Sequence, residues 1–524
     1  MKEGKASGLI KKFATVGGAT MASRVLGFVR EAMIAAALGA GPVADVFYVC
    51  FRLPNLFRRL FAEGAFNIAF VPLFAKELEG GGKDAATGFA REVFAVLATW
   101  LIAFTALAMI FMPFLLSVLL RESFTADADK FELSVTMTRI MFPYLFCMSL
   151  VAMFSGMLNA LRHYFFAAIV PVLLNVILIV VLYFGMTLGL DAKTIGLLLA
   201  WGVFVSGFAQ LALLYVGIRR EGMHMTLRSP RFSPAVKRLL ILMGPGLVTG
   251  GVLQINLLIG TVIATAQDGA NALLNYADRL NQLPLGVIGI AVGVVLLPEL
   301  SRALKAGDKA EADKLQNRSL EFALALTLPA AVGFMVIPDD IVRLLYERGA
   351  FGADATRQTA AALLAFATGL PAYVMIKVFQ PAFFAREDMR TPLYFSVVMV
   401  LVNVIVSLAL FPSMGHVAIA VGTSASAWVN VGLLAVTQWN RGDFRPDSGT
   451  LKRLLLLLTG AVLMGAGVMT VRAVLFVDLP DMSFGGQLIS VGALIAVGAL
   501  IYLAFVLASG AIERDVMRKA FRRG

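Results

Sequence analysis

The sequence predicts an all-α polytopic membrane protein with about 14 transmembrane helices. Three observations predict this class: the composition, apolar segments of membrane length that recur from end to end, and an internal repeat. Of the 524 residues, 59% are hydrophobic and only 15% are charged, and the mean hydropathy is +0.84. Because a soluble domain has about 45–50% apolar and about 25% charged residues, lipid must solvate this chain.

About fourteen segments are long and apolar enough to cross a hydrocarbon layer of ~30 Å. Their approximate limits are set by the hydropathy and by the charged residues that interrupt the apolar segments. They cover residues 14–39, 44–74, 90–118, 133–160, 165–187, 195–217, 239–265, 271–299, 318–337, 358–384, 391–411, 416–438, 453–475 and 485–508.

The N-terminal segment superficially resembles a signal peptide, because several lysines precede an apolar run. Arg24, Arg30 and Glu31 interrupt that run, and no clean apolar core leads to a small-residue cleavage site. We therefore expect the segment to be retained as the first transmembrane helix.

Positive charge is distributed unevenly between the two sets of loops. Most of the 45 lysines and arginines fall at the N-terminus, in the loops after even-numbered segments and at the C-terminus. Basic residues stay on the cytoplasmic side of a membrane. The sequence therefore predicts cytoplasmic termini, and the net charge of +12 indicates contact with anionic lipid headgroups rather than with nucleic acid.

The chain also repeats itself. VPVLLNVILIVVL at 170–182 matches VMVLVNVIVSLAL at 398–410, which pairs Asn175 with Asn403, 228 residues later. Similar offsets pair Pro143 with Pro371, Arg162 with Arg390, Pro72 with Pro298 and Arg52 with Arg279. We predict two parallel six-helix lobes around a central cationic cavity, at 1–222 and 223–440, followed by two further helices and a basic cytoplasmic tail at 441–524. Substrate sites in such transporters lie between the lobes.

Charged residues are concentrated where lipid should exclude them. The first two segments contain Arg24, Arg30, Glu31, Asp45, Arg52, Arg58, Arg59 and Glu63. Each arginine facing lipid at mid-bilayer would cost about 2.5–3.5 kcal/mol. These arginines therefore need a wet cavity, charged partners or a route to the interface.

Helical spacing favours a cavity. Arg24, Gly27 and Glu31 share one face of the first segment, and Asp45, Tyr48, Arg52, Asn55 and Arg59 share one face of the second. In the eighth segment Asn271, Asn275, Asp278 with Arg279, and Gln282 form another polar stripe. Salt bridges between helices and snorkelling arginines are the alternative explanation. A cavity with excess arginine would bind an anion such as phosphate or carboxylate.

Other kinds of site lack sequence support. The two cysteines lie in apolar segments and the three histidines are far apart, so we expect neither a disulfide framework nor a metal site. The phosphate-binding pattern GxxxxGK[ST] is absent, which argues against direct use of ATP. We expect no cofactor.

Three segments carry a family resemblance: SRVLGFVRE, FRLPNLFRRLFAEGAFNIAFVPLF and YADRLNQLPLGVIGIAVGVVLLPELSR. They resemble the MurJ (MviN) family, the lipid II flippases of the multidrug/oligosaccharidyl-lipid/polysaccharide exporter superfamily. The resemblance implies fourteen helices around a cationic cavity in the bacterial cytoplasmic membrane. It implies that lipid II, an undecaprenyl diphosphate bearing a disaccharide-pentapeptide, is moved from the inner to the outer leaflet for cell-wall synthesis.

The resemblance also suggests roles for individual residues. Arg24, Arg30 and Arg279, with Ser23, would bind the diphosphate and nearby anionic groups. Gating and conformational change would involve Asp45 and Arg58. We add to this second group the remaining intramembrane charges: Glu31, Arg52, Arg59, Glu63 and Asp278.

Several alternatives remain open. Another lipid-linked oligosaccharide or amphiphile could be the exported molecule, or the chain could be a scaffold for cell-wall synthesis. An enzyme acting on a polyprenyl phosphate would need clustered acids or histidines, and only Asp339 and Asp340 come near that pattern. We expect a monomeric transporter without enzymatic activity, in contact with membrane lipids and with cell-wall synthesis proteins as further candidate partners.

Overall fold

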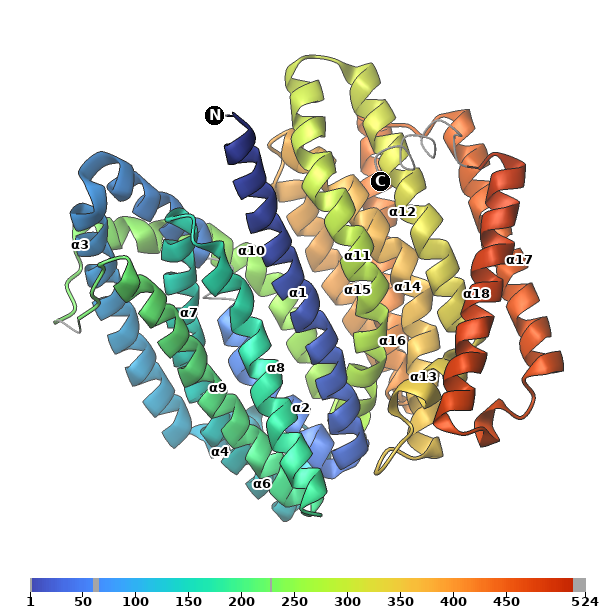
Figure 1. Ribbon diagram of the computed structural model, residues 1–524, viewed down its shortest axis with the longest axis horizontal. Coiled ribbons are helices and arrows are strands. Elements are labelled where there is room, and N and C mark those ends of the chain that lie inside the picture. The colour runs from blue at the N-terminus through green and yellow to red at the C-terminus, as the bar shows by residue number, and fades with distance from the viewer. Residues whose placement is uncertain (1, 60–65, 227–228, 512–524) are drawn as a thin grey trace. The chain divides into compact units, whose positions relative to one another are not determined.

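The computed structural model describes residues 2–59, 66–226 and 229–511, and every regular element in these ranges is a helix (Figure 1). The predicted all-α class is confirmed. The chain forms two compact units. The first unit comprises Met1–Ala272 and Arg348–Phe351, and the second comprises Leu273–Glu347 and Gly352–Gly524. This boundary lies at residue 272 rather than 222, and the three-part division drawn from the repeat stays a prediction.

The first unit contains ten helices within the described ranges, and α11 begins at its end. They are α1 (Lys2–Leu38), α2 (Pro42–Phe57), α3 (Asn67–Ile110), α4 (Met112–Leu119), α5 (Glu122–Thr125), α6 (Ala128–Met141), α7 (Pro143–Ala160), α8 (Tyr164–Thr187), α9 (Ala192–Arg220) and α10 (Pro234–Ala264). Helix α8 packs against α1 and α9, and α7 packs against α3 and α9. Helix α2 packs against α6 and α9.

The second unit contains the remaining helices. They are α11 (Ala270–Lys305), α12 (Lys309–Val336), α13 (Pro338–Tyr346), α14 (Ala353–Ala385), α15 (Arg390–Met414), α16 (Val417–Arg441), α17 (Ser448–Leu475), the short 3-10 helix η2 (Leu479–Asp481) and α18 (Phe484–Ser509). Helix α16 packs between α14 and α15, and α14 also packs against α12. Helices α17 and α18 pack on each other and on α12.

Predicted and observed limits agree where the apolar segments are uninterrupted. The fifth, sixth and eleventh to fourteenth predicted segments match α8, α9 and α15–α18 to within a few residues. Among the residues that the structure describes, ten helical segments between 67 and 509 are long and apolar enough to cross a membrane by themselves. Helix α2 is only 16 residues long, so the count of fourteen is not confirmed.

Three predicted segments each overlap two helices of the structure: 44–74 overlaps α2 and α3, 90–118 overlaps α3 and α4, and 133–160 overlaps α6 and α7. The segment 44–74 includes the end of α2 at Phe57 and the start of α3 at Asn67, and residues 60–65 between them lie outside the described residues. Helix α3 consists of two helices that meet at a kink at Gly82, inside the predicted loop between 74 and 90, where φ is +72°, a conformation that only glycine adopts without strain. Pro143 begins α7 directly after α6. The segment 133–160 is therefore two helices.

Short polar side chains begin several of the long helices. Each side chain accepts a hydrogen bond from a backbone N–H in the first helical turn, which satisfies a donor that the helix itself leaves unpaired. These residues are Asp127 for α6, Asp191 for α9, Ser233 for α10, Asp308 for α12, Asp447 for α17 and Ser483 for α18.

The internal repeat is visible in the packing of each unit. Helix α9 packs against α7 and α8, and α16 packs against α14 and α15 in the same way. Gln210 in α9 donates to the Val170 carbonyl at 2.9 Å, and Gln438, 228 residues later in α16, donates to the Phe379 carbonyl at 2.8 Å. The two equivalent glutamines therefore each donate to a helix carbonyl, but the acceptor helices differ, because Val170 lies on α8 and Phe379 on α14.

One predicted pairing in the repeat is different in the structure. Arg162 follows α7 with a φ of +66°, and the equivalent residue after α14 is Glu387, with a φ of +62°. The backbone N–H of the next residue bonds the fifth carbonyl before it in both turns, His163 to Leu158 and Asp388 to Phe383. Arg390 is instead the first residue of α15. The turn in the second unit is longer, so Arg162 is equivalent to Glu387 and not to Arg390.

Candidate functional site

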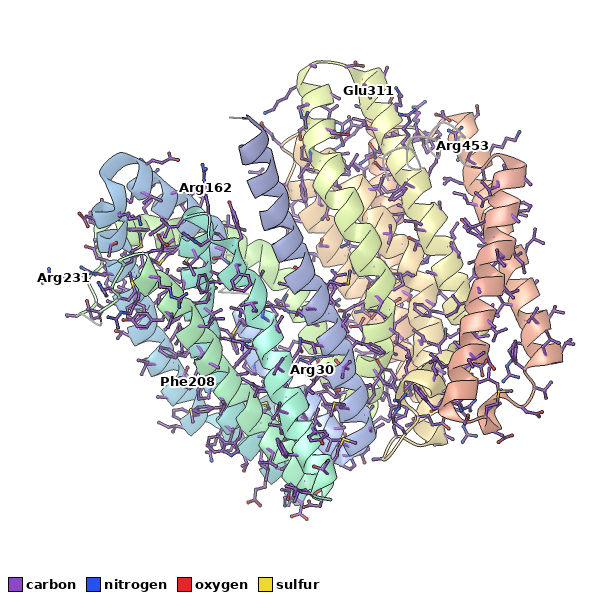
Figure 2. All side chains as sticks on the ribbon, viewed as in Figure 1. Arg30, Arg162, Phe208, Arg231, Glu311 and Arg453 are labelled. Atoms are coloured by element: carbon purple, nitrogen blue, oxygen red, sulfur yellow. The ribbon has the colours of Figure 1, made fainter. Side chains whose placement is uncertain are left out.

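Arg30 lies on α1 (Figure 2) and belongs to a buried network of hydrogen bonds. The Arg30 guanidinium donates to Glu31 and, through Nη1, to Asn175 Oδ1 on α8 at 2.9 Å. Tyr48 on α2 donates its hydroxyl to Glu31 Oε2 at 2.6 Å. Only 8% of Arg30 and 4% of Glu31 are exposed. The network therefore connects three helices and neutralises the Arg30 charge within the first unit.

Arg24 has a different environment from Arg30. Its side chain is exposed, whereas Gly27 and Glu31 on the predicted shared face are buried. Among the described residues, Arg24 makes no hydrogen bond or ion pair. The neighbouring Ser23 is half-buried, and its carbonyl accepts a hydrogen bond from Asn175 Nδ2 at 3.0 Å. Arg24 is therefore an exposed cation, in contrast to the buried and paired Arg30.

Asp45 lies in the first turn of α2 and is completely buried. Its Oδ1 accepts from the backbone N–H of Asn271 at 2.8 Å, close to the start of α11. Lys130 Nζ lies 3.5 Å from Asp45 Oδ2 and 2.6 Å from Asp268 Oδ1. Through these contacts Asp45 joins α2, α6 and the start of α11. The helix dipole adds to this, because it stabilises a carboxylate near a helix N-terminus.

The arginines of α2 make contacts within the first unit. Arg52 Nη1 donates to Thr261 Oγ1 on α10 at 2.6 Å. Arg58 Nε donates to Asn55 Oδ1 at 3.0 Å. Arg59 is exposed. Glu63 lies outside the described residues.

Two predicted site residues, Asp278 and Arg279, belong to the second unit. Both lie on α11 and are half-buried. Asp278 accepts a hydrogen bond from Gln282 Nε2, one turn further along α11. Arg279 makes no hydrogen bond or ion pair to any residue that the structure describes. The convergence of Arg24, Arg30 and Arg279 on one cavity stays a prediction.

Three partners of these residues were not assigned to the site from the sequence. Asn175 was identified only as a marker of the repeat, Tyr48 only as part of a polar face, and Lys130 was not singled out. Asn175 and Lys130 lie far along the chain from Arg30 and Asp45, whereas Tyr48 lies 17 residues from Glu31. The sequence could have indicated Asn175 as a site residue, because its amide side chain lies in an otherwise apolar helix.

The described residues contain no group of three or more His, Cys, Asp or Glu side chains placed to hold a metal ion. Cys50 and Cys147 are buried free thiols.

Comparison with known families identifies the chain's relatives. The family model described as lipid II flippase MurJ matches residues 34–479, a span that contains α2 and the buried partners of α1. The chain belongs to the MurJ family of lipid II flippases. The predicted family resemblance is confirmed.

Individual MurJ relatives match along most of their length. The probable lipid II flippase MurJ of Rhizobium meliloti (strain 1021) is 50% identical over 98% of this chain and 97% of its own. The Rhizobium tropici protein of the same description is 51% identical over 87% and 86%. The lipid II flippase MurJ of Burkholderia cenocepacia is 35% identical over 88% of this chain and 89% of its own. This is a multi-pass membrane protein of a transporter family.

Solved structures agree on the fold. A lipid II flippase MurJ in an inward closed conformation superposes with a TM-score of 0.76 and 24% identity, covering 96% of this chain and 99% of its own. An inward-facing multidrug resistance transporter of the MATE family and the MOP superfamily superposes with a TM-score of 0.68 and 16% identity, covering 80% and 94%. The architecture is thus common to MurJ and MATE transporters.

Proposed function

We propose that this chain is a lipid II flippase. It moves the undecaprenyl-diphosphate-linked disaccharide-pentapeptide from the inner to the outer leaflet of a bacterial cytoplasmic membrane by alternating access. Membership of the MurJ family and 50% identity to a Rhizobium relative over 98% of the chain support this proposal. The chain acts as a transporter without enzymatic activity, with both termini in the cytoplasm, and functions as a monomer.

The observation that carries the proposal is the contrast between Arg24 and Arg30. Both lie on α1, but Glu31 and Asn175 already bind the Arg30 guanidinium. Arg24 has no such partner among the residues described. An arginine kept in a membrane-spanning helix at a cost of about 2.5–3.5 kcal/mol needs an anion to compensate it. A diphosphate, whose oxygens match the guanidinium fork, provides that anion.

The remaining site residues follow from this contrast. Arg24, Ser23 and Arg279 contact the diphosphate and nearby anionic groups directly. Arg30 binds the same anion when its guanidinium releases the Glu31 carboxylate and donates to a phosphate oxygen instead. Because Glu31 also holds Tyr48 of α2, this exchange would transmit substrate binding from α1 to α2.

Gating in this proposal involves the charged residues of α2 and α11. Asp45 holds the start of α11 and is held by Lys130, so breaking these contacts would free α11 from α2. Arg52 and Arg58, together with Glu31, Arg59, Glu63 and Asp278, adjust their polar contacts during the conformational cycle. Cell-wall synthesis proteins are candidate partners on either side of the membrane.

Complementation of a flippase-depleted bacterial strain tests the proposal. Arg24→Ala, Arg30→Ala and Arg279→Ala should each insert in the membrane but fail to restore growth. Arg121→Ala is the matched control, because Arg121 is exposed and uses only its backbone in hydrogen bonds. Normal growth with all three cavity variants would contradict the proposal. Growth supported by a variant that no longer moves lipid II would indicate a scaffold instead.

A further inference from the structure

A pocket lies at the end of α16, within the second unit. Six of its seven lining residues are apolar or aromatic, and its volume is about 500 Å³. Pockets of about 300–1,000 Å³ are typical of small-ligand sites. The lining residues are Phe379, Ala435, Val436, Trp439, Asn440, Phe444 and Pro446.

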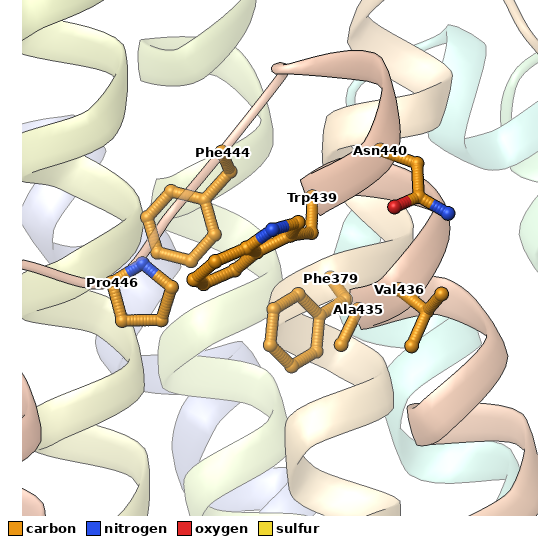
Figure 3. Close-up of a pocket in the computed structure, with 7 residues that line it drawn as sticks. All are labelled: Phe379, Ala435, Val436, Trp439, Asn440, Phe444 and Pro446. Atoms are coloured by element: carbon orange, nitrogen blue, oxygen red, sulfur yellow. The ribbon is translucent and has the colours of Figure 1, made fainter.

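The floor of the pocket is fixed by contacts within the second unit. The rings of Phe379 and Phe444 are buried, with centroids 6.2 Å apart. Gln438 Nε2 holds the Phe379 carbonyl at 2.8 Å. Figure 3 shows the Trp439 indole between Phe444 and Pro446 on one side and Phe379 and Ala435 on the other. The pocket is therefore preformed and apolar.

The rim of the pocket is aromatic and basic. Trp439 is 48% exposed although it lines an apolar pocket. The guanidinium carbon of Arg445 lies 5.0 Å from the centre of the Trp439 ring. Tryptophan and arginine are both favoured at the level of lipid headgroups, where one side of the residue is apolar and the other is wet.

The acids near this rim are already bound. Asp388 accepts from Arg441 at 2.8 Å, and Asp443 accepts from Arg386 at 3.2 Å. Asp447 caps the first turn of α17. Within the described parts of the chain, Arg445 makes no hydrogen bond or ion pair. The rim therefore has one basic group to offer an external anion.

We propose that this pocket binds an anionic glycerophospholipid. One acyl chain lies against Phe379, Val436 and Trp439, and the phosphate meets Arg445. A lipid fits because the pocket lies at the end of a membrane-spanning helix, combines an apolar floor with a cation at its rim, and is open on the side of the exposed Val436. The inference does not depend on what the chain transports.

Quenching of Trp439 fluorescence by brominated phospholipids tests the proposal. The full chain with Trp100, Trp201 and Trp428 changed to Phe keeps Trp439 as its single tryptophan. All three replaced residues are at least 45% exposed, so the substitutions create no cavity in the buried core. The chain is reconstituted in phosphatidylcholine, and brominated phosphatidylglycerol or brominated phosphatidylcholine with identical acyl chains is then titrated.

Phosphatidylglycerol should quench with a relative association constant about fivefold above that of phosphatidylcholine, the factor expected from one basic residue near an anionic lipid. Arg445→Gln should remove this preference. Lys452→Gln is the matched control, because it removes an exposed charge from the second turn of α17, and it should leave the preference unchanged.

Three results would overturn the proposal. They are equal quenching by the two lipids, a preference that survives Arg445→Gln, and displacement of the brominated lipid by undecaprenyl phosphate at lower concentration than by unlabelled phosphatidylglycerol. If the single-tryptophan chain does not fold, the difference in quenching between the unaltered chain and Trp439→Phe measures the same quantity.

Discussion

At the scale of single residues, the pairing of Arg30 with its chain neighbour is unusual. Successive residues on a helix point about 100° apart and do not normally meet. Here Tyr48 holds Glu31 from one side, and Asn175 holds Arg30 from the other. The buried pair is thus shaped by two other helices, and this explains why the sequence of α1 alone does not reveal it.

Removing one partner of this pair should destabilise the protein strongly. Arg30→Met leaves Glu31 as a buried, uncompensated charge, which costs about 3–5 kcal/mol. The double variant Arg30→Met/Glu31→Met should lose less than the sum of the two single variants. Thermal unfolding in detergent, followed by circular dichroism, measures these differences. Arg24→Gln is the control and should unfold like the unaltered chain; additive losses would show that the pair is not coupled.

Lys130 should be needed for the same physical reason near the start of α2. Lys130→Met leaves the fully buried Asp45 without its cation, at a cost of about 3–5 kcal/mol. Asp45→Asn combined with Lys130→Met should recover most of that stability, because an amide oxygen can still accept from the Asn271 N–H. The same unfolding assay applies, with Lys193→Met as an exposed control. No loss of stability in Lys130→Met would contradict the assigned contact.

At the scale of helices, close packing depends on small residues at particular positions. A Cβ atom added to Gly422 on α16 would lie 2.4 Å from Ser407 Oγ and 2.9 Å from the Asn403 carbonyl oxygen on α15. A Cβ atom added to Gly432, on the same helix, would meet nothing within 4 Å. These two glycines therefore offer a matched pair.

Gly422→Ala should lower stability by about 1–3 kcal/mol through overpacking. Gly432→Ala should raise stability by up to about 1 kcal/mol, the difference in helix propensity between the two residues. Melting temperatures in one detergent compare the two variants directly. Equal effects of both substitutions would argue against the observed contact between α15 and α16.

The turn between α14 and α15 should respond to acid. Burial acts to raise the pKa of the Asp388 carboxyl, but hydrogen bonds from Arg441 and Thr391 outweigh it and lower that pKa to about 2. The unfolded value is about 3.9. The stabilisation is therefore present above about pH 4 and is lost as the pH falls through about 2.

Asp388→Asn should make stability less dependent on pH across this window. Unfolding midpoints between about pH 5 and pH 2 measure the change, with Asp481→Asn as an exposed control that removes the same charge. An unchanged pH profile in Asp388→Asn would mean that the ion pair with Arg441 contributes nothing to stability.

The sequence could predict whole helices better than breaks within them. Helices α8, α9 and α15–α18 were predicted because each is a continuous apolar run between polar turns. The division between α6 and α7 was not predicted, because the segment 133–160 stays apolar enough to suggest one helix. The kink of α3 at Gly82 lies in the loop that the sequence predicted between the segments 44–74 and 90–118.

At the scale of the whole molecule, the repeat predicted the internal packing of the units. The same offset that pairs Asn175 with Asn403 also pairs Gln210 with Gln438. The sequence also identified Arg24, Arg30 and Asp45 as charges in need of an explanation. It could not supply the partners of Arg30, Asp45 and Arg52, because Asn175, Lys130 and Thr261 are separated from them by 85 or more residues, and no local pattern encodes such contacts.

The central claim is that Arg24 is an anion-binding cation required for moving lipid II. It predicts a loss in transport of about tenfold to a hundredfold in Arg24→Ala, because one hydrogen bond to a charged group contributes about 1.5–3 kcal/mol. Membrane insertion should not change, since Arg24 has no partner among the described residues.

The most direct test measures how much lipid II is accessible at the outer face of flippase-depleted cells that express this chain. The unaltered chain and Arg121→Ala should both restore access to an externally added lipid II-modifying enzyme. Arg24→Ala, present in the membrane at the same level, should not. Equal lipid II access with Arg24→Ala, or none with the unaltered chain, would contradict the account.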